Sequence, residues 1–405
     1  MVDHTEEINY LRTPQAIRER TGKIFELCKA GQTHFEYHPE KLEEVSDFVL
    51  EVIKENYPEL EIPFHSRWGH FKVGGFDRVA LLEKRLSGDA LEKARTKLDL
   101  VITSVLLDAG AGPNWSYFEK NTGESFSRSE GLGVASFHMF CEGYFSSDKS
   151  NPFRADGEAL RNLVTEELQM AFQVKDSNPL VGAAGRTQLI NRLGQTVLSK
   201  TEFFKDARPG NIVDYLIDKH GESFEVQDIL QAVLLGLGDI WPSRLQLDDT
   251  NLGDVWRHQG LVDSDPENCL VPFHKLSQWL TYSLVEPMIE AGLNITGAEK
   301  LTGLAEYRNG GLILDSGLVT LRDSSLRYSA HTPDSDLIIE WRALTIQLLD
   351  LLADRIREKL GFTPENFPLA KVLEGGTWWA GRKIAKSLRE DSSPPLQLDS
   401  DGTVF

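Results

Sequence analysis

Cysteine is scarce in this sequence: Cys28, Cys141 and Cys269 are the three present, and they lie far apart. An odd number of cysteines without a CxxC spacing argues against a disulfide framework and against a cysteine-bound metal, and it is typical of a reducing compartment. Long apolar runs are also missing, since none approaches the roughly 18 residues of a transmembrane helix. Residues 1–15 lack the basic-then-apolar order of a signal peptide. These absences predict a cytoplasmic protein with no membrane partner.

Positive charge is the next deficit, because 43 Lys and Arg stand against 62 Asp and Glu, for a net charge of −19. This balance disfavours nonspecific binding to nucleic acid, so we expect no nucleic-acid partner, and an anionic small ligand would need a local group of Arg and Lys. The sequence also has no GxSxG, HExxH or Walker motif. We therefore expect neither a metal nor a cofactor. The sequence does not indicate an oligomeric state.

What is present is a succession of helical patterns in a chain of 405 residues, 40% of them apolar, which is long enough for a large core. Thr13-Pro14 is a good helix start, and the apolar stripe that follows ends at Gly31. Alternating strand patterns are few, although residues 312–330 favour short strands or a hairpin. Further helices are predicted at residues 40–56, 89–107, 128–143, 157–173, 185–199, 211–219, 225–236, 272–286 and 336–360.

These patterns predict a mainly α fold with few short strands. The chain shows no internal repeat, no low-complexity tract and no obvious linker. We therefore expect an N-terminal helical subdomain at residues 1–88, packed as one unit with a helical catalytic region at residues 89–405.

The stretch that stands out runs from Thr296 to Asp315, where the triplet Glu306-Tyr307-Arg308 precedes Asn309-Gly310-Gly311. The glycines are expected to break the backbone. A capping box at Thr296 and Glu299 would start a helix whose last turn holds Glu306, and the helix dipole would then raise the pKa of that carboxyl. A helix that begins after the triplet would instead place Glu306 at its N-terminus and favour its negative charge. The sequence leaves both alternatives open.

Three other regions gather polar and aromatic side chains outside a simple core pattern. Each has two interpretations: the loop at 62–76 is a pocket wall or a connector, Trp115 covers a sugar or packs in the core, and the polar stripe on the helix at 272–286 is a pocket face or a solvated face. The residues concerned are His65, Arg67 and His70 in the loop, Asp108 and Trp115 after the helix at 89–107, and Lys275 and Gln278 in the stripe.

A carboxylate beside an aromatic ring and an arginine suits cleavage of a glycosidic bond on a phosphorylated sugar. The oxocarbenium-like transition state is stabilised by a nearby negative charge, and a phosphate is bound by Arg or Lys. A surface ion pair between Glu306 and Arg308 explains the triplet about as well.

Four motifs add a resemblance. The ordered set VLLDAGAGPNWSYFE, FHKLSQWLTYSL, LAEYRNGGLILDSGLVTLRD and EGGTWWAGRKIA resembles the uracil catabolism protein 4 family, a family of unknown function in fungi and bacteria. The resemblance extends from about residue 10 to the C-terminus. It implies a role in a uracil degradation route that passes through nucleotide-level intermediates and releases urea.

The order of the motifs is also similar to that of the queuosine salvage nucleosidases, which share a helical architecture with DNA glycosylases. This second resemblance implies an integrated multi-helix fold and matches the stretch from Asp108 to Trp115, the residues Phe273, Lys275 and Gln278, and the stretch from Ala305 to Arg308. The chain departs from that pattern in two places. Glu306 stands where those enzymes have Asp, and Gly310-Gly311 replaces a Pro-Gln pair.

Together these observations predict an N-ribosyl hydrolase that cleaves a (phospho)ribosyl urea to urea and ribose or its phosphate. The partner is then a small phosphorylated ribosyl substrate. The alternatives are a noncatalytic partner that binds a nucleotide or a pathway enzyme, and an amidohydrolase acting on the ring-opened base. The expected catalytic residues are Glu306 and Asp108, and the expected substrate-binding residues are Lys275, Gln278, Tyr307, Arg308, Trp115, Arg67, His65 and His70.

Overall fold

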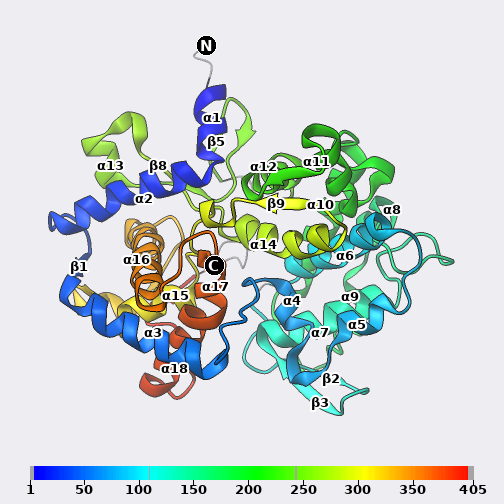
Figure 1. The fold of residues 1–405 in the computed structure, drawn as a ribbon, viewed down its shortest axis with the longest axis horizontal. Helices are drawn as coiled ribbons and strands as arrows, with labels where there is room; N and C mark the ends of the chain where they lie inside the picture. The colour runs from blue at the N-terminus through cyan, green and yellow to red at the C-terminus, as the bar shows by residue number, and fades with distance from the viewer. Residues whose placement is uncertain (1–3, 109, 242–243, 400–405) are drawn as a thin grey trace. The chain divides into compact units, whose positions relative to one another are not determined.

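The computed structural model describes residues 4–108, 110–241 and 244–399, and its contacts group the chain into two compact units (Figure 1). The first unit contains residues 4–65, 244–278 and 297–399, and the second contains residues 66–241 and 279–296. This grouping differs from the expected division between residues 88 and 89, because that point lies inside the second unit.

The first unit is helical and is built around the long helix α16, which packs against α2 and α3 (Figure 1). As predicted, Thr13 caps α2 by accepting a hydrogen bond from the backbone N–H of Ala16 at 3.0 Å, and α16 ends at Gly361, whose φ is 73°. Its helices are α1 (Thr5–Leu11), α2 (Pro14–Lys29), α3 (Leu42–Asn56), α13 (Gln259–Ser264), α15 (Tyr307–Asp315), α16 (Asp336–Leu360), α17 (Leu369–Val372), α18 (Trp378–Leu388) and the first turn of α14 (Lys275–Glu290).

The second unit is helical as well and holds the rest of α14. Its longest helices are α6, which Asp89 caps through the backbone N–H of Glu92 at 2.8 Å, and α10, which packs closely on α8. The predicted helix at 157–173 is two helices, α8 and α9. The helices are α4 (Arg67–His70), α5 (Arg78–Glu83), α6 (Ala90–Leu106), α7 (Arg128–Cys141), α8 (Gly157–Asn162), α9 (Thr165–Ala171), α10 (Ala183–Ser199), α11 (Ile212–His220) and α12 (Val226–Leu237).

Strands are short and join in pairs, so the mainly α prediction is confirmed. In the first unit the pairs are β1 (Phe35–Tyr37) with β10 (Val319–Leu321), β5 (Gln246–Leu247) with β6 (Thr250–Asn251), β7 (Val255–Arg257) with β8 (Leu270–Pro272), and β11 (Ala330–His331) with β12 (Gln397–Leu398). In the second unit they are β2 (Ser116–Glu119) with β3 (Glu124–Ser127), and β4 (Ser223–Glu225) with β9 (Asn294–Thr296). Of the two alternatives for residues 312–330, the short strand is found at β10 and the hairpin is not, because β10 pairs with β1 and β11 with β12.

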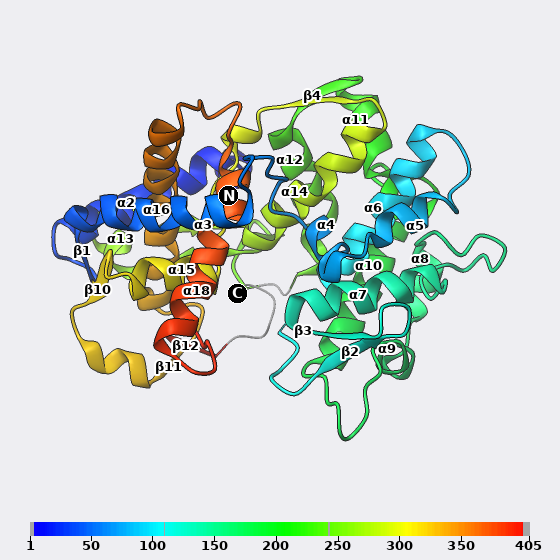
Figure 2. The same cartoon turned by 60° about the horizontal axis from the view of Figure 1, so that its bottom comes forward.

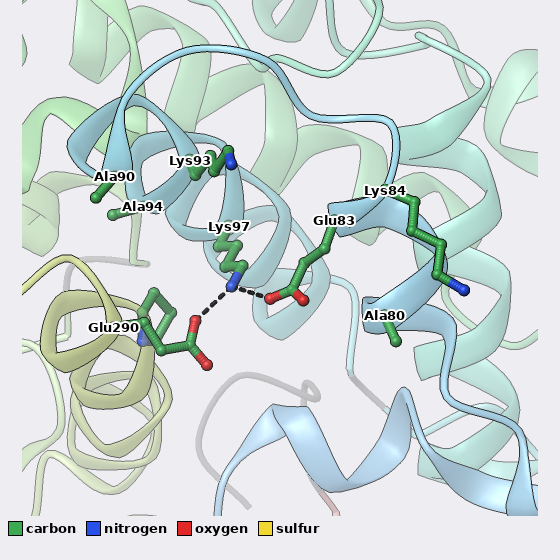
Figure 3. Close-up of a pocket in the computed structure, with 9 residues that line it drawn as sticks. Ala80, Glu83, Lys84, Ala90, Lys93, Ala94, Lys97 and Glu290 are labelled. Atoms are coloured by element: carbon green, nitrogen blue, oxygen red, sulfur yellow. Dashed lines mark hydrogen bonds and ion pairs between the residues drawn. The ribbon is translucent and has the colours of Figure 1, made fainter.

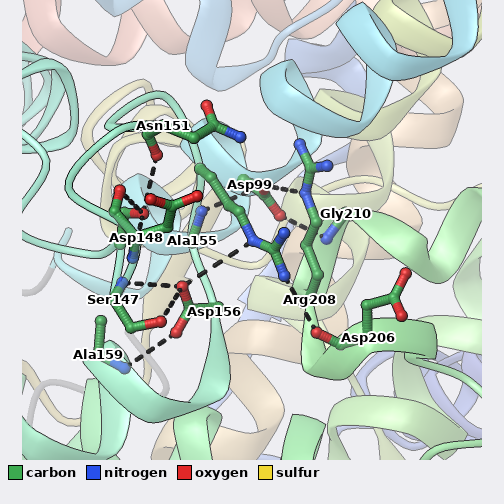
Figure 4. Close-up of polar contacts among 12 residues, drawn as sticks. Asp99, Ser147, Asp148, Asn151, Ala155, Asp156, Ala159, Asp206, Arg208 and Gly210 are labelled. Atoms are coloured by element: carbon green, nitrogen blue, oxygen red, sulfur yellow. Dashed lines mark hydrogen bonds and ion pairs between the residues drawn. The ribbon is translucent and has the colours of Figure 1, made fainter.

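A buried carboxylate ties three segments of the second unit together (Figure 4). Asp99 of α6 accepts hydrogen bonds from the guanidinium of Arg208 at 2.6 Å, the backbone N–H of Gly210 at 2.7 Å and that of Ala155 at 3.1 Å. Gly210 is needed there, since a Cβ would lie 2.2 Å from the carbonyl oxygen of Arg95. Through these three hydrogen bonds the Asp99 carboxylate links α6 to the segments at Ala155 and at Arg208 and Gly210.

The core of the first unit gathers apolar side chains from α1, α2, α16 and the β7–β8 pair, among them Ile17, Trp256, Val271 and Ile346. Across the described ranges 4–108, 110–241 and 244–399, none of the helices has both the length and the hydrophobicity that spanning a bilayer requires.

Candidate functional site

Glu306 is the residue that caps helix α15. Its backbone is extended (φ −116°, ψ 164°), and its carboxylate accepts hydrogen bonds from the backbone N–H groups of Arg308 at 2.8 Å and Asn309 at 2.6 Å. The capping box expected at Thr296 and Glu299 leads to a short turn of 3-10 helix at Ala298–Lys300, and a non-helical segment follows it. Of the two alternatives, the helix that begins after Glu306 is therefore correct.

The surroundings of Glu306 act on its charge in opposite directions. The residue is only 7% exposed, and this burial raises the pKa of the carboxyl above its ordinary value. The two backbone N–H groups oppose the rise, as do the positive charges of Lys275 and His65. Burial outweighs them, so Glu306 accepts a proton more readily than an exposed glutamate does, although it lies at a helix N-terminus.

Gly310 and Gly311 lie inside α15, so the expected break in the backbone is wrong. They allow close packing instead: a Cβ on Gly310 would lie 2.9 Å from the indole of Trp341, whose N–H donates to the Gly310 carbonyl at 2.9 Å. On the other side, a Cβ on Gly381 of α18 would lie 2.1 Å from the Arg308 carbonyl oxygen. The start of α15 is thus held tightly against α16 and α18, as Figure 2 shows.

Lys275 and Gln278 of α14 are placed by hydrogen bonds to Asp254 and Thr302. Asp254 accepts the backbone N–H of Lys275 at 3.0 Å and a two-point ion pair from Arg342 at 2.8 and 2.7 Å. Gln278 is buried and accepts the backbone N–H of Thr302 at 3.0 Å while it donates to the Thr302 hydroxyl at 2.6 Å. Gln278 therefore does not lie on a solvated face, and it fixes the segment that leads to Glu306.

His65 belongs to a carboxylate–imidazole pair that the sequence did not reveal. Its Nδ1 lies 2.8 Å from a carboxylate oxygen of Glu374, and the other oxygen of Glu374 accepts from the Tyr57 hydroxyl at 3.3 Å. Glu374 stands on a short π-helix, Leu373–Thr377, between α17 and α18. Single π turns are frequent at functional sites. The available signal was the pair of glycines after Glu374 in the motif EGGTWW.

One aromatic ring lies beside this pair, and two arginines of the first unit lie over rings of α15 and α18. Trp378, at the start of α18, is half-buried, and its ring centroid lies 6.2 Å from that of His65. The Arg382 guanidinium lies 5.6 Å from the ring centroids of Trp378 and of Trp379. Arg308 is buried over the ring of Tyr307 at 4.9 Å, and it donates to the Ser392 carbonyl at 3.1 Å.

The remaining predicted residues lie in the second unit, around a closed ion pair. Arg67 is fully buried and contacts Asp108 at 2.9 Å, the hydroxyl of Ser104 at 2.7 Å and the carbonyl of Ser129 at 3.3 Å. Burial lowers the pKa of Arg67, and the neighbouring Asp108 opposes this shift.

Trp115 takes the packed-core alternative. It is 1% exposed, it stacks on Phe172 and its indole N–H donates to the Phe172 carbonyl at 3.0 Å. The ring of His70 packs edge-on against Trp279. The Arg67 guanidinium also lies over Trp279, 5.7 Å from its ring centroid. The structure thus brings Arg67, Asp108 and His70 together within the second unit and places Trp115 in its core.

Two further observations do not involve the predicted residues. A cavity of about 770 Å³ in the second unit is lined by Lys97 and its ion-pair partners Glu83 and Glu290 (Figure 3). Within residues 4–108, 110–241 and 244–399, no three His, Cys, Asp or Glu side chains are arranged to hold a metal ion.

Fold and site define a mainly helical protein in which ionisable side chains surround a buried carboxylate at a helix N-terminus. A family described as "Protein of unknown function (DUF1688)" matches residues 10–405, and the chain belongs to this family. It is 38% identical over 436 residues to uracil catabolism protein 4 of Lachancea kluyveri, a match that covers 98% of this chain and 99% of that protein. It is 39% identical over 415 residues to protein urg3 of Schizosaccharomyces pombe, covering 99% and 100%. The family resemblance of the four motifs is confirmed.

Proposed function

We propose that this protein acts in uracil catabolism as an N-ribosyl hydrolase, which cleaves a ribosyl or phosphoribosyl urea to urea and ribose or its phosphate. The pathway is suggested by the name of the Lachancea kluyveri relative, which is similar over nearly its full length. The reaction is suggested by the release of urea that the resemblance implies and by the carboxylate of Glu306.

The observation that carries the reaction is the buried Glu306 carboxylate, fixed by two backbone N–H groups and influenced by the charges of Lys275 and His65. Each carboxylate oxygen has two lone pairs, so one on each oxygen remains beyond the capping hydrogen bonds. Because burial raises its pKa, this carboxyl is suited to accept a proton from water while it stabilises a cationic sugar.

A phosphate on the substrate would be held by positive side chains of the same unit. Lys275 is half-buried at the start of α14, and Arg308 follows Glu306 by two residues. The buried Nε of Arg308 has no hydrogen-bond acceptor among the described residues, which leaves a donor for an anionic group.

The direct test is turnover by the purified protein. It is incubated with phosphoribosyl urea and, separately, with UMP, and urea and free sugar phosphate are assayed. We expect both products from phosphoribosyl urea and none from UMP. Binding without product would favour the noncatalytic alternative. Release of ammonia without urea would favour the amidohydrolase, because hydrolysis of the ureido group gives ammonia and carbon dioxide.

Glu306→Gln tests the assigned residue. Loss of one electrostatic group at the transition state typically costs about 100- to 1000-fold in kcat, and we expect a loss of this size. Glu306→Asp is the matched variant, because Asp caps helices well but its carboxylate is one methylene shorter. Because Asp stands at this position in the enzymes of the second resemblance, we expect Glu306→Asp to keep more turnover than Glu306→Gln. Glu306→Gln turnover within about threefold of wild type would contradict the assignment.

A further inference from the structure

The pair formed by His65 and Glu374 has the geometry of an oriented imidazole. The carboxylate of Glu374 can only accept, so the His65 Nδ1 that lies 2.8 Å away carries the hydrogen. This arrangement fixes the tautomer and assigns proton transfer to the other ring nitrogen, Nε2. The Tyr57 hydroxyl, whose pKa burial raises, stays protonated and donates to the second oxygen of Glu374 at 3.3 Å.

The backbone around the pair is built for close approach. Glu374 precedes Gly375 and Gly376, where a Cβ would lie 2.7 Å from the side chains of Ile62 and Val49, respectively. The backbone of His65 is also held in place, since its backbone N–H donates a hydrogen bond to the Ala370 carbonyl at 3.1 Å. Glycine at both positions lets the π-helix lie close to α3 and to the segment that ends at His65, beside the Glu374–His65 contact.

The same π-helix contacts α15, the helix that Glu306 caps, and α15 packs against α18, which begins with Trp378. The oriented imidazole, the capping carboxylate and a half-exposed ring therefore belong to one neighbourhood of the first unit. Within the described ranges 4–108, 110–241 and 244–399, the other buried histidines are His258 and His274, whose ring nitrogens contact Glu340 and the Leu11 carbonyl, respectively.

We propose that His65 is the general acid that protonates the departing urea nitrogen, and that Glu374 is a positioning residue that orients its ring. This inference rests on the N-ribosyl hydrolase function proposed above. It assigns to His65 a catalytic role in place of the substrate contact expected from the sequence, and it brings Glu374 into the site.

The step balances as follows. The bond between C1′ and the urea nitrogen breaks, its electron pair stays on that nitrogen, and the proton on His65 Nε2 moves to the nitrogen. Water adds to C1′ and gives a proton to Glu306. Solvent then carries a proton from Glu306 back to His65, so one water is consumed and urea and the free sugar are formed.

Several charged or titratable groups face this histidine, and any pH profile reflects them together. Glu374 contacts it from the π-helix, and the charges of His65 and Lys275 both act on Glu306 at the start of α15. Tyr57 reaches it through Glu374, and Arg382 of α18 stacks on the neighbouring Trp378.

The test compares two leaving groups on the same sugar phosphate. Urea is a poor leaving group that needs a proton, whereas 4-nitrophenolate leaves without one. General acid catalysis contributes about 100- to 10,000-fold, so His65→Gln should lower kcat on phosphoribosyl urea by at least about 100-fold. Its kcat on the 4-nitrophenyl riboside 5′-phosphate should fall by less than about fivefold. The alkaline limb of the kcat profile for phosphoribosyl urea should also disappear, because a general acid must be protonated.

His34→Gln is the matched control. His34 contacts Glu340 through Nδ1 at the same 2.8 Å, and that pair lies in the first unit but outside the site. We expect unchanged turnover of both substrates. Should His65→Gln fail to fold, Glu374→Gln carries the test: it should move the alkaline limb and reduce turnover of phosphoribosyl urea more than that of the nitrophenyl substrate.

Three results would overturn the proposal. Equal losses on both substrates in His65→Gln or Glu374→Gln would make the pair a structural element or a substrate contact. If Glu306→Gln is impaired on both substrates while His65→Gln resembles wild type, the proposed function stands and the acid role of His65 fails. If the wild-type protein turns over neither substrate, both the proposed function and this inference are rejected.

Discussion

In the second unit, the Arg67 guanidinium meets the Asp108 carboxylate at 2.9 Å, and both side chains are almost fully buried. In the first unit, the equally buried Glu306 carboxylate is held by backbone N–H groups, which carry no net charge. A buried ion pair satisfies both charges and is costly to open. A carboxylate held by neutral backbone dipoles can gain and lose a proton without breaking an ion pair. Acid–base chemistry requires such a group.

The largest effect that we expect comes from breaking the closed pair. Asp108→Asn removes the negative charge and leaves Arg67 buried without its partner, which typically costs about 3–5 kcal/mol of stability. Urea unfolding should show this loss, and hydrogen exchange should show weakened protection in α6 and α7, which hold Ser104 and Ser129. Glu306→Gln is the matched change in the first unit and should cost far less stability while it lowers turnover by about 100- to 1000-fold.

This pair of variants also tests the catalytic role that the sequence suggested for Asp108. A catalytic Asp108 predicts that Asp108→Asn stays folded and loses turnover, as Glu306→Gln does. A structural Asp108 predicts that whatever protein remains folded retains its turnover. Equal stability of the two variants would remove the distinction between the two units.

The dependence of stability on pH should distinguish the same two units. Burial raises the pKa of Glu306 above 4.5, so its contribution to stability is fully present below that pH and is lost as pH rises through the folded-state value. Glu119 of the second unit behaves oppositely. Burial acts to raise its pKa, but hydrogen bonds from Arg78, His138 and Thr122 lower it to about 2, so its contribution is present above pH 4.5 and is lost as pH falls.

Urea unfolding of wild type, Glu306→Gln and Glu119→Gln across this range checks both signs. As pH rises, the free energy of unfolding of wild type should fall relative to that of Glu306→Gln. As pH falls, the free energy of unfolding of wild type should fall relative to that of Glu119→Gln. Parallel curves for wild type and Glu306→Gln would show that the pKa of Glu306 is not raised.

The fold was predictable where its signals are local. Thr13 caps α2 as the Thr13-Pro14 pair predicts, and α16 ends at Gly361 as expected. The strand pairs were not predictable, because β1 pairs with β10 nearly 300 residues later and such short strands carry no periodic pattern. Local signals left two alternatives open for Glu306, and the helix that starts after it is the correct one. The pKa of the Glu306 carboxyl is raised by burial, which depends on distant segments.

The candidate site was predictable only in part, for a similar reason. Glu306 was identified from its neighbours in the chain and from the family motifs. Glu374 was missed because its partner His65 is 309 residues away and no local pattern links them. Trp115 looked like a ring for a sugar, yet Phe172 covers it, and a single sequence does not show which rings are covered.

The smallest effects concern the two glycines of α15, and they test how tightly the first unit holds its carboxylate. Gly310→Ala would place a methyl group 2.9 Å from Trp341, and overpacking of this kind costs about 1–3 kcal/mol. Because the strain falls within the first turns of α15, turnover should drop together with the melting temperature. Gly194→Ala in the second unit, whose Cβ would lie 2.3 Å from the backbone nitrogen of Arg161, should lower stability and leave turnover intact.

Gly311→Ala is the matched control and should have the opposite sign. Its Cβ would meet nothing closer than Pro395 at 3.5 Å, an ordinary contact, and alanine is favoured over glycine inside a helix by up to about 1 kcal/mol. We therefore expect a slightly higher melting temperature and wild-type turnover. If Gly311→Ala instead lowers turnover as Gly310→Ala does, then α15 must flex during the reaction, and the Glu306 carboxylate is not held rigidly by its helix.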